Sequence, residues 1–186
     1  MKQLPSRLTI VVVLIVSALL VCAGRTRATE ISGTISTTLI IFDDSELTGD
    51  VTCAVPLTLV GPNPCIAFGA DHIKLRLNGH SITGPVTPPT DCDVPKPGDK
   101  FGVGIAAIDR TDVKIEGPGI VQHFERWGIL IGLTGHPSTQ VTVKKVTAYR
   151  NCWSGMQTFS TSESNFEENV FASDAGGSNG ANCGGT

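Results

Sequence analysis

Side chains that could transfer protons lie in one short segment, Asp109–Asp112, which directly follows an apolar run. Hydrolysis of a glycosidic bond requires two carboxyl groups that converge across a groove. If successive strands stack in parallel, the first two residues of this segment are expected near Glu125 or Arg126 of a neighbouring turn. The candidate catalytic residues are therefore Asp109, Arg110 and Asp112. The simpler interpretation is a solvated turn whose Asp side chains accept hydrogen bonds from backbone N–H groups.

Two tryptophans stand where they could contact sugar rings. Trp127 precedes Gly128, and Trp153 lies two positions before Gly155; each glycine opens an apolar run. A parallel stack is expected to align the two indoles along one face, which makes Trp127 and Trp153 candidate carbohydrate-binding residues. Filling the corners of the fold is the structural alternative for both side chains.

The remaining metal-binding residue types predict no site. The four histidines have no spacing that forms a ligand set, and no C-x-x-C pair is present. We therefore expect no metal and no cofactor from spacing alone.

The elements that must position these residues are strands. Beyond residue 30 no window keeps helical spacing for three turns, and short β-branched runs alternate with Gly, Asn, Asp and Pro. Glycine followed by an apolar residue opens a run at Gly104, Gly128 and Gly155, and Gly185 could open another, at spacings of 24, 27 and 30 residues. Such a period with short strands is typical of a solenoid. The sequence predicts an all-β parallel β-helix, with an antiparallel sandwich as the alternative.

A single turn of such a solenoid cannot bury its own apolar side chains, so the turns must stack. Inward Ile, Val and Leu are buried only when turns stack at the spacing of neighbouring strands, about 4.8 Å. Asn78, Asn151 and Asn169 are candidate corner residues, because Asn tolerates left-handed backbone angles and its amides can form ladders between turns. The segments Gly132–Ser138 and Pro85–Lys100 are predicted as loop insertions between turns.

Two motifs resemble right-handed parallel β-helix proteins of the pectate-lyase-like superfamily. Residues Ile73–Gly84 read IKLRLNGHSITG, which is similar to the first-coil motif of that family, and Asn151–Met156 resembles its strand opening. The family includes polysaccharide lyases, hydrolases, epimerases and adhesins. For a lyase the resemblance implies Ca²⁺ held by Asp109 and Asp112, with Arg110 as the base.

The N-terminus has the layout of an export signal. Lys2 and Arg7 precede an apolar run from Leu8 to Ala23, which is shorter than the roughly 20 residues of a spanning helix. We expect a signal peptide at 1–23, with an uncleaved anchor as the alternative, a β cap at 24–70, and coils at 71–186 that are incomplete at the C-terminus, as in a fragment. Cleavage moves the net charge from −3 to −5, which argues against nucleic acid as a partner. The mature chain is then expected to be secreted, periplasmic or at the cell surface, with no membrane span.

Cysteines fit an oxidising compartment. Loss of Cys22 leaves five, of which Cys53 and Cys65 flank a short apolar stretch and are the favoured disulfide. The pairing of Cys92, Cys152 and Cys183 stays open, because an odd count leaves one without a partner in this chain.

These observations favour an exported β-helix that binds polysaccharide or a cell-surface partner. The alternatives are a polysaccharide lyase or glycoside hydrolase, and a structural or adhesin segment. A convergent acidic cluster in a groove would favour an enzyme. A flat face lined by Trp and Thr would favour binding.

Overall fold

The computed structural model describes residues 27–56, 61–86 and 102–173. All the regular secondary structure in these residues consists of β-strands. The signal peptide predicted at 1–23 and most of the insertion predicted at 85–100 lie outside the described residues. The strands are β1 (Thr29–Ile35), β2 (Leu39–Ile41), β3 (Ser45–Cys53), β4 (Asn63–Phe68), β5 (Lys74–Arg76), β6 (Ser81–Thr83), β7 (Gly102–Ala107), β8 (Lys114–Gln122), β9 (Trp127–Ile131), β10 (Ser138–Thr139), β11 (Thr142–Asn151), β12 (Ser154–Thr158), β13 (Thr161–Ser162), β14 (Asn165–Glu167) and β15 (Val170–Ser173).

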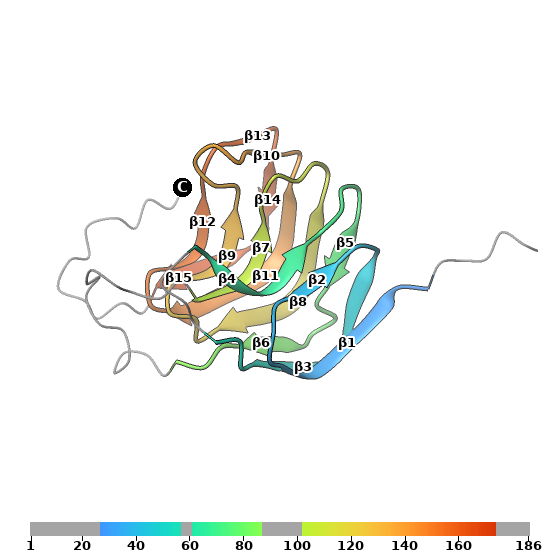
Figure 1. The fold of residues 1–186 in the computed structure, drawn as a ribbon, viewed down its shortest axis with the longest axis vertical. Helices are drawn as coiled ribbons and strands as arrows, with labels where there is room; N and C mark the ends of the chain where they lie inside the picture. Colours follow the sequence, from blue (N-terminus) through green and yellow to red (C-terminus); the bar gives the residue numbers. More distant parts are fainter. Residues whose placement is uncertain (1–26, 57–60, 87–101, 174–186) are drawn as a thin grey trace, which may run out of the picture.

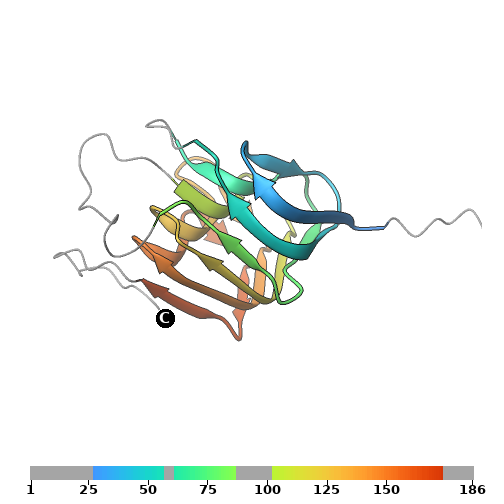
Figure 2. The same ribbon diagram turned by 90° about the horizontal axis from the view of Figure 1, so that it is seen from below.

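The strands form two large parallel sheets and one small one. The first sheet has the order β1-β3-β5-β8-β11-β14, with β6 and β15 alongside, and the second has the order β12-β9-β7-β4-β2. The chain passes alternately through the two sheets, so each pass forms a coil that stacks on the coil before it (Figures 1 and 2). All pairings between these strands are parallel. The predicted parallel solenoid is therefore confirmed, and the antiparallel sandwich is wrong.

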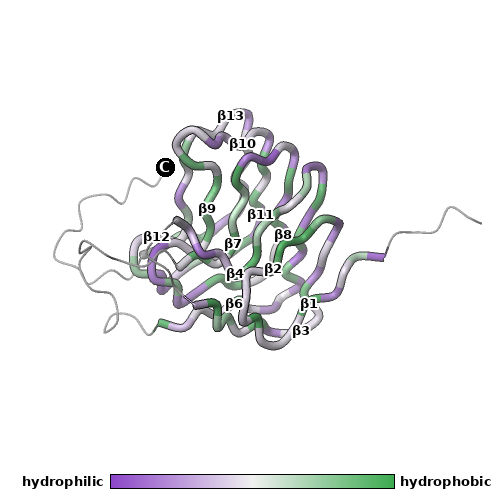
Figure 3. Tube along the Cα trace, viewed as in Figure 1, coloured by the Kyte–Doolittle hydropathy of each residue, from purple (hydrophilic) through white to green (hydrophobic). Residues whose placement is uncertain are grey.

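Inward side chains at equivalent positions of successive coils form continuous columns. One column runs in register from Ser45 through Leu75, Ile115 and Val143 to Phe166. The first four of these residues are completely buried. Figure 3 shows the result as hydrophobic segments along β7, β8, β9 and β11, with hydrophilic segments on the turns around β10 and β13. Burial by the neighbouring coils supplies the core that a single coil lacks.

The repeated glycines have a steric cause. A Cβ on Gly104 would lie 2.4 Å from the carbonyl oxygen of Gly128, and one on Gly128 would lie 2.6 Å from the carbonyl oxygen of Gly155. A Cβ on Gly155 would lie 2.3 Å from the carbonyl oxygen of Ala148. Each contact is far shorter than a carbon–oxygen contact allows. The close approach of successive coils therefore requires Gly104 and Gly128, whereas the carbonyl of Ala148, on β11 of the same coil, requires Gly155.

Asparagine side chains join coils at the corners. Asn151 is buried; its Oδ1 accepts from the backbone N–H of Phe124 at 3.0 Å, and its Nδ2 donates to the carbonyl of Val121 at 3.1 Å. Asn169 makes the same pair of bonds to backbone groups of β11, and Asn78 donates to a carbonyl of β3. The predicted corner positions are confirmed, but of the three only Asn78 has the expected left-handed backbone; at the other two corners the preceding residue, Arg150 or Glu168, has it. The amides bond to the backbone of the preceding coil, however, and not to one another.

Charges of alternating sign follow the outward side of the first sheet. Glu46, Arg76, Glu116, Lys144 and Glu167 occupy equivalent positions of five successive strands. Arg76 Nε lies 3.5 Å from Glu116 Oε2, and Lys144 Nζ lies 2.8 Å from Glu167 Oε2. Opposite charges on neighbouring strands stabilise each other, so this column contributes to the observed pairing.

The ion pair at the end of this column, Lys144 with Glu167, shifts the pKa values of both groups. Hydrogen bonding to Lys144 lowers the pKa of Glu167 below its ordinary value of 4.5, with a contribution from Asn165, and the same bond raises the pKa of Lys144. The stabilisation is therefore present above pH 4.5, and it disappears as the pH falls through the lowered pKa of Glu167. We expect NMR titration of the Glu167 carboxyl to show a midpoint below 4.5 that returns towards 4.5 in Lys144→Ala. Lys145→Ala removes only the neighbouring ion pair with Glu168, whose atoms are 3.6 Å apart, so the titration midpoint of Glu167 should stay below 4.5 in this variant. An unchanged midpoint in Lys144→Ala would contradict the pairing.

A disulfide joins the two sheets near the start of the solenoid. Cys53 at the end of β3 and Cys65 in β4 form the pair that the sequence favours, with Cα atoms 5.8 Å apart. Cys152 is also disulfide-bonded, to a cysteine outside the described residues. These bonds are compatible with an extracellular location. No helix in the described part of the chain has the length and apolarity needed to cross a membrane.

Candidate functional site

The candidate catalytic residues lie at the corner that follows β7. Asp109 Oδ2 is 2.8 Å from His136 Nδ1, and Asp112 Oδ2 is 3.1 Å from His72 Nδ1. Glu125 and Arg126 do not join them, contrary to expectation. The physical reason is strand direction: in a parallel sheet the residues after β7 lie beside the residues after β9, whereas Glu125 and Arg126 precede β9. Sequence analysis did not identify the two histidines as partners of these carboxylates. The fold of the corner brings them together, and no local spacing in the sequence indicates it.

The backbone of this corner is a series of left-handed turns. His72, Asp109 and Asp112 have φ values of 59°, 55° and 51°. Asp71 Oδ1 accepts a hydrogen bond from the backbone N–H of Thr111 at 3.0 Å. Asp and His are enriched in this conformation, so the segment is a turn as expected. The carboxylate that accepts from its backbone is Asp71 of the preceding coil, however, whereas Asp109 and Asp112 contact histidines. The carboxylates thus have structural partners before any substrate is considered.

Arg110 is held on the outer side of the second sheet. Its Nε donates to the carbonyl of Ile108 at 3.0 Å, its Nη1 donates to the carbonyl of Gly69 at 3.3 Å, and Asp71 Oδ1 lies 3.8 Å from Nη1. A guanidinium stays protonated in proteins, which suits it to binding and not to proton abstraction. In the described ranges no group of three or more His, Cys, Asp or Glu side chains converges as metal ligands would. The donor set at this corner does not fit the Ca²⁺ site that the lyase hypothesis requires.

The tryptophans belong to a second hydrophobic cluster. Val103, Ala106, Trp127 and Leu130 are buried together on β7 and β9, apart from the main core, and Trp153 packs against them. Both faces of these two strands are covered, which explains their unbroken apolar sequence.

The expected alignment of the indoles is wrong. Trp127 pairs in register with Ser154, not with Trp153, and the two rings meet edge to face at 89° with centroids 5.8 Å apart. Trp127 is only 5% exposed, and the guanidinium of Arg126 lies 4.0 Å from the centroid of Trp153. Their geometry supports corner packing more than a platform for sugar rings.

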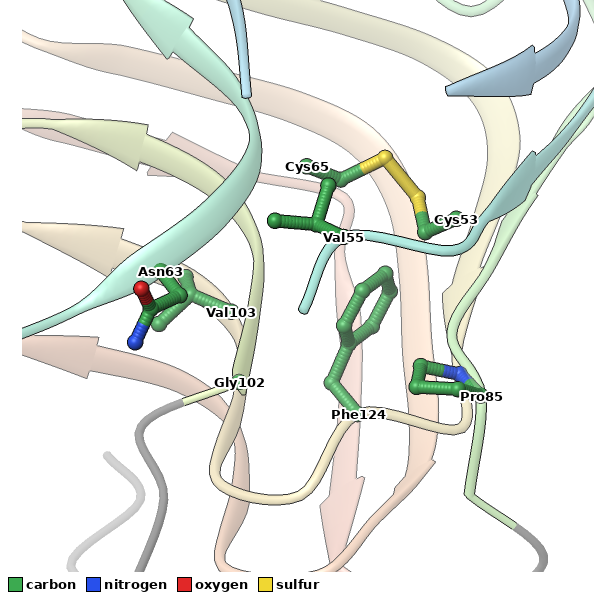
Figure 4. A pocket seen from close by; sticks show the side chains of 8 residues that line it. All are labelled: Cys53, Val55, Asn63, Cys65, Pro85, Gly102, Val103 and Phe124. Atoms are coloured by element: carbon green, nitrogen blue, oxygen red, sulfur yellow. A yellow bond between two sulfur atoms is a disulfide. The ribbon is translucent and has the colours of Figure 1, made fainter. Parts of the chain in front are cut away.

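A shallow pocket beside the disulfide offers little chemistry. Cys53, Cys65, Val103 and Phe124 line it, and the Phe124 ring lies below the disulfide in Figure 4. Asn63 is its polar side chain, and none of its lining residues is an acid, a base or a nucleophile. This pocket cannot supply acid–base catalysis.

A row of uncharged polar side chains crosses the far half of the first sheet. Thr34 on β1, Thr52 on β3, Thr83 on β6, Gln122 on β8 and Tyr149 on β11 are register partners in successive coils. We name these five residues the neutral row. All are exposed or half-buried, while the residue before each of the last four is buried. The Gln122 amide donates to Thr83 Oγ1 at 3.2 Å, which joins two coils along the row.

His123, which follows Gln122 of the neutral row, has a lowered pKa. Burial lowers the pKa of His123 below its ordinary value of 6.5, and the positive charge of Arg150 lowers it further. The imidazole is therefore neutral at neutral pH. The guanidinium of Arg150 lies 5.5 Å from the centroid of the Tyr149 ring, so a positive charge borders the neutral row at this end. Sequence reasoning missed this row, because a single polar residue beside a buried one in each strand becomes a row only when the register is known.

Comparison with known proteins finds a distant structural similarity. No protein-family model and no curated protein matches the chain. The crystal structure of the Dettilon tailspike protein matches with a TM-score of 0.47 and 16% identity, over 84% of this chain and 35% of that one. The chain thus spans about a third of the length of the tailspike protein, and a likeness at this level carries no inference about function.

Proposed function

We propose that this chain is an exported, right-handed parallel β-helix of the pectate-lyase-like superfamily that binds an uncharged polysaccharide along the neutral row. The observation that carries the proposal is the row itself: five register partners on successive coils, all neutral and all able to form hydrogen bonds. Neighbouring strands are about 4.8 Å apart. That spacing is similar to the length of one sugar unit in an extended chain, so a repeating polymer could meet a repeating surface.

The chemistry of the row suits hydroxyl-rich ligands. Thr hydroxyls and the Gln122 amide each donate and accept, as sugar hydroxyls do. Tyr149 adds a ring with an apolar face and a polar tip. The enzyme alternative lacks comparable support, because Asp109 and Asp112 are paired with histidines and Arg110 is held as a cation.

Affinity electrophoresis in gels that contain neutral polysaccharides tests this proposal. Glucans, mannans and galactans are the neutral probes, and polygalacturonate is the acidic comparison. We expect retardation by at least one neutral polymer. Tyr149→Ala should weaken it about tenfold, which corresponds to about 1.4 kcal/mol. Thr83→Val, which removes a hydroxyl at nearly constant volume, should weaken it severalfold.

Lys145→Ala is the matched control, because Lys145 is exposed on the same strand β11 but outside the neutral row. Its retardation should equal that of the wild type. Equal retardation of Tyr149→Ala and the wild type, or retardation by polygalacturonate alone, would refute binding at this row.

A further inference from the structure

An exposed aromatic ring lies at the opposite side of the molecule from the neutral row. Phe42 follows β2, the last strand of the second sheet, and is 67% exposed, while Ile40 on the same strand is 50% exposed. Both side chains lie over Gly69 of the next coil, where a Cβ would be 2.6 Å from the Phe42 ring and 2.5 Å from Ile40 Cγ2. The absence of a Cβ at Gly69 thus lets the Phe42 ring approach the backbone closely.

The backbone of the same glycine also holds a cation. Arg110 reaches back by one coil, and its Nη1 donates to the carbonyl of Gly69 at 3.3 Å while its Nε donates to the carbonyl of Ile108 at 3.0 Å. Two backbone acceptors hold the guanidinium in place at little further entropic cost on binding. Phe42 and Arg110 therefore both contact the backbone unit of Gly69.

A carboxylate completes the group. Asp71 Oδ1 lies 3.8 Å from Arg110 Nη1 and is oriented by the backbone N–H of Thr111 at 3.0 Å. A guanidinium donor next to a carboxylate acceptor matches two adjacent hydroxyls on a sugar ring, one accepting and one donating. The exposed phenyl ring could cover the apolar face of that sugar.

Charge selects the class of sugar. The cation of Arg110 is balanced by Asp71, and Asp109 and Asp112 flank it on the same turn, so three carboxylates stand against the cations of Arg110 and Lys114. An anionic ligand, whether an acidic sugar or a phosphate, would be repelled. We propose that the corner formed by Phe42, Gly69, Asp71 and Arg110 binds a single neutral pyranose, independently of the neutral row.

Amide NMR of the full chain with simple glycosides tests this site. The probes are the methyl glycosides of glucose, galactose and mannose, with glucuronate as the anionic comparison. We expect at least one neutral glycoside to give saturable shifts at Gly69, Asp71 and Thr111. Phe42→Ala should weaken this binding about tenfold, and Arg110→Lys should weaken it because the planar donor geometry is lost.

Two controls separate this site from the rest of the surface. Phe166→Ala removes another exposed phenylalanine, on β14 at the far end of the solenoid, and should leave binding unchanged. Tyr149→Ala should also leave it unchanged, even if the neutral row proves inactive. Phe42→Leu keeps an apolar side chain if the alanine variant unfolds, and should bind as weakly. Absence of shifts at the three amides, equal binding by Phe42→Ala and Phe166→Ala, or stronger binding of glucuronate than of the neutral glycosides would overturn the proposal.

Discussion

Alanine in place of Gly128 is expected to lower the free energy of unfolding by about 3 kcal/mol, because the added methyl group overfills the stack. The new Cβ would lie 2.6 Å from the carbonyl oxygen of Gly155 and 2.7 Å from the buried Asn151 amide. Neither group can move without breaking contacts between coils. Urea denaturation followed by circular dichroism measures the change.

Gly135→Ala provides the comparison for this substitution. Nothing lies within 4 Å of a Cβ at Gly135, but its φ is +82°, so alanine there adds only backbone strain of about 1 kcal/mol. A loss of stability in Gly128→Ala no larger than that in Gly135→Ala would show that the coils do not approach as closely as described.

Asn151→Ala is expected to cost about 3 kcal/mol, since each buried backbone group left without a partner costs roughly 1–3 kcal/mol. The variant leaves the N–H of Phe124 and the carbonyl of Val121 unbonded in a buried corner. Asn151→Asp retains the acceptor for Phe124 but places a carboxylate against a carbonyl, so it should also be strongly destabilised.

Asn78→Ala is the control for this prediction, and the same denaturation experiment measures it. Asn78 is exposed, so water can replace the hydrogen bonds that its amide makes to the neighbouring coil. The decrease in the free energy of unfolding should be much smaller for Asn78→Ala than for Asn151→Ala. Equal losses for the two variants would contradict the special role of the buried corner.

Much of the fold could be predicted from local pattern. The Gly-apolar openings at Gly104, Gly128 and Gly155 indicated the repeat, and all three glycines prove to have no space for a side chain. The corner asparagines and the Cys53–Cys65 pair were likewise visible, because both depend on residue type at a turn or on a short separation. The sequence pattern that indicates strands was weaker in the first coils. β1 is mostly polar and exposed, and β3 has polar residues even at some inward positions, such as the buried Ser45, so their period-2 pattern of hydrophobic residues is diluted.

The candidate sites depended on information that one sequence lacks. Two residues become neighbours in a solenoid only when the number of residues in each coil is known, and loops vary that number. The pairing of Asp109 with His136 crosses such a loop, and Trp127 lies one position out of step with Trp153. The neutral row depends on the same register, and so does the contact of Phe42 and Arg110 with Gly69.

Both proposed surfaces bind neutral sugars but differ in what they require. The neutral row crosses five coils and favours an extended polymer, whereas the Phe42 corner accommodates one ring. A chain with both could hold a polymer along its side and a separate sugar at its first coils. Neither surface needs an acid–base pair.

Dependence of affinity on ligand length tests binding along the neutral row most directly. Isothermal titration with cello-, malto- and manno-oligosaccharides of increasing length measures it, in a Phe42→Ala background that removes the other proposed site. If a chain lies along the row from Thr34 to Tyr149, affinity for at least one series should rise with each added sugar and level off at about five units, the number of coils that the row crosses. A disaccharide that binds as tightly as the longest oligomer, or no binding in any series, would contradict the account.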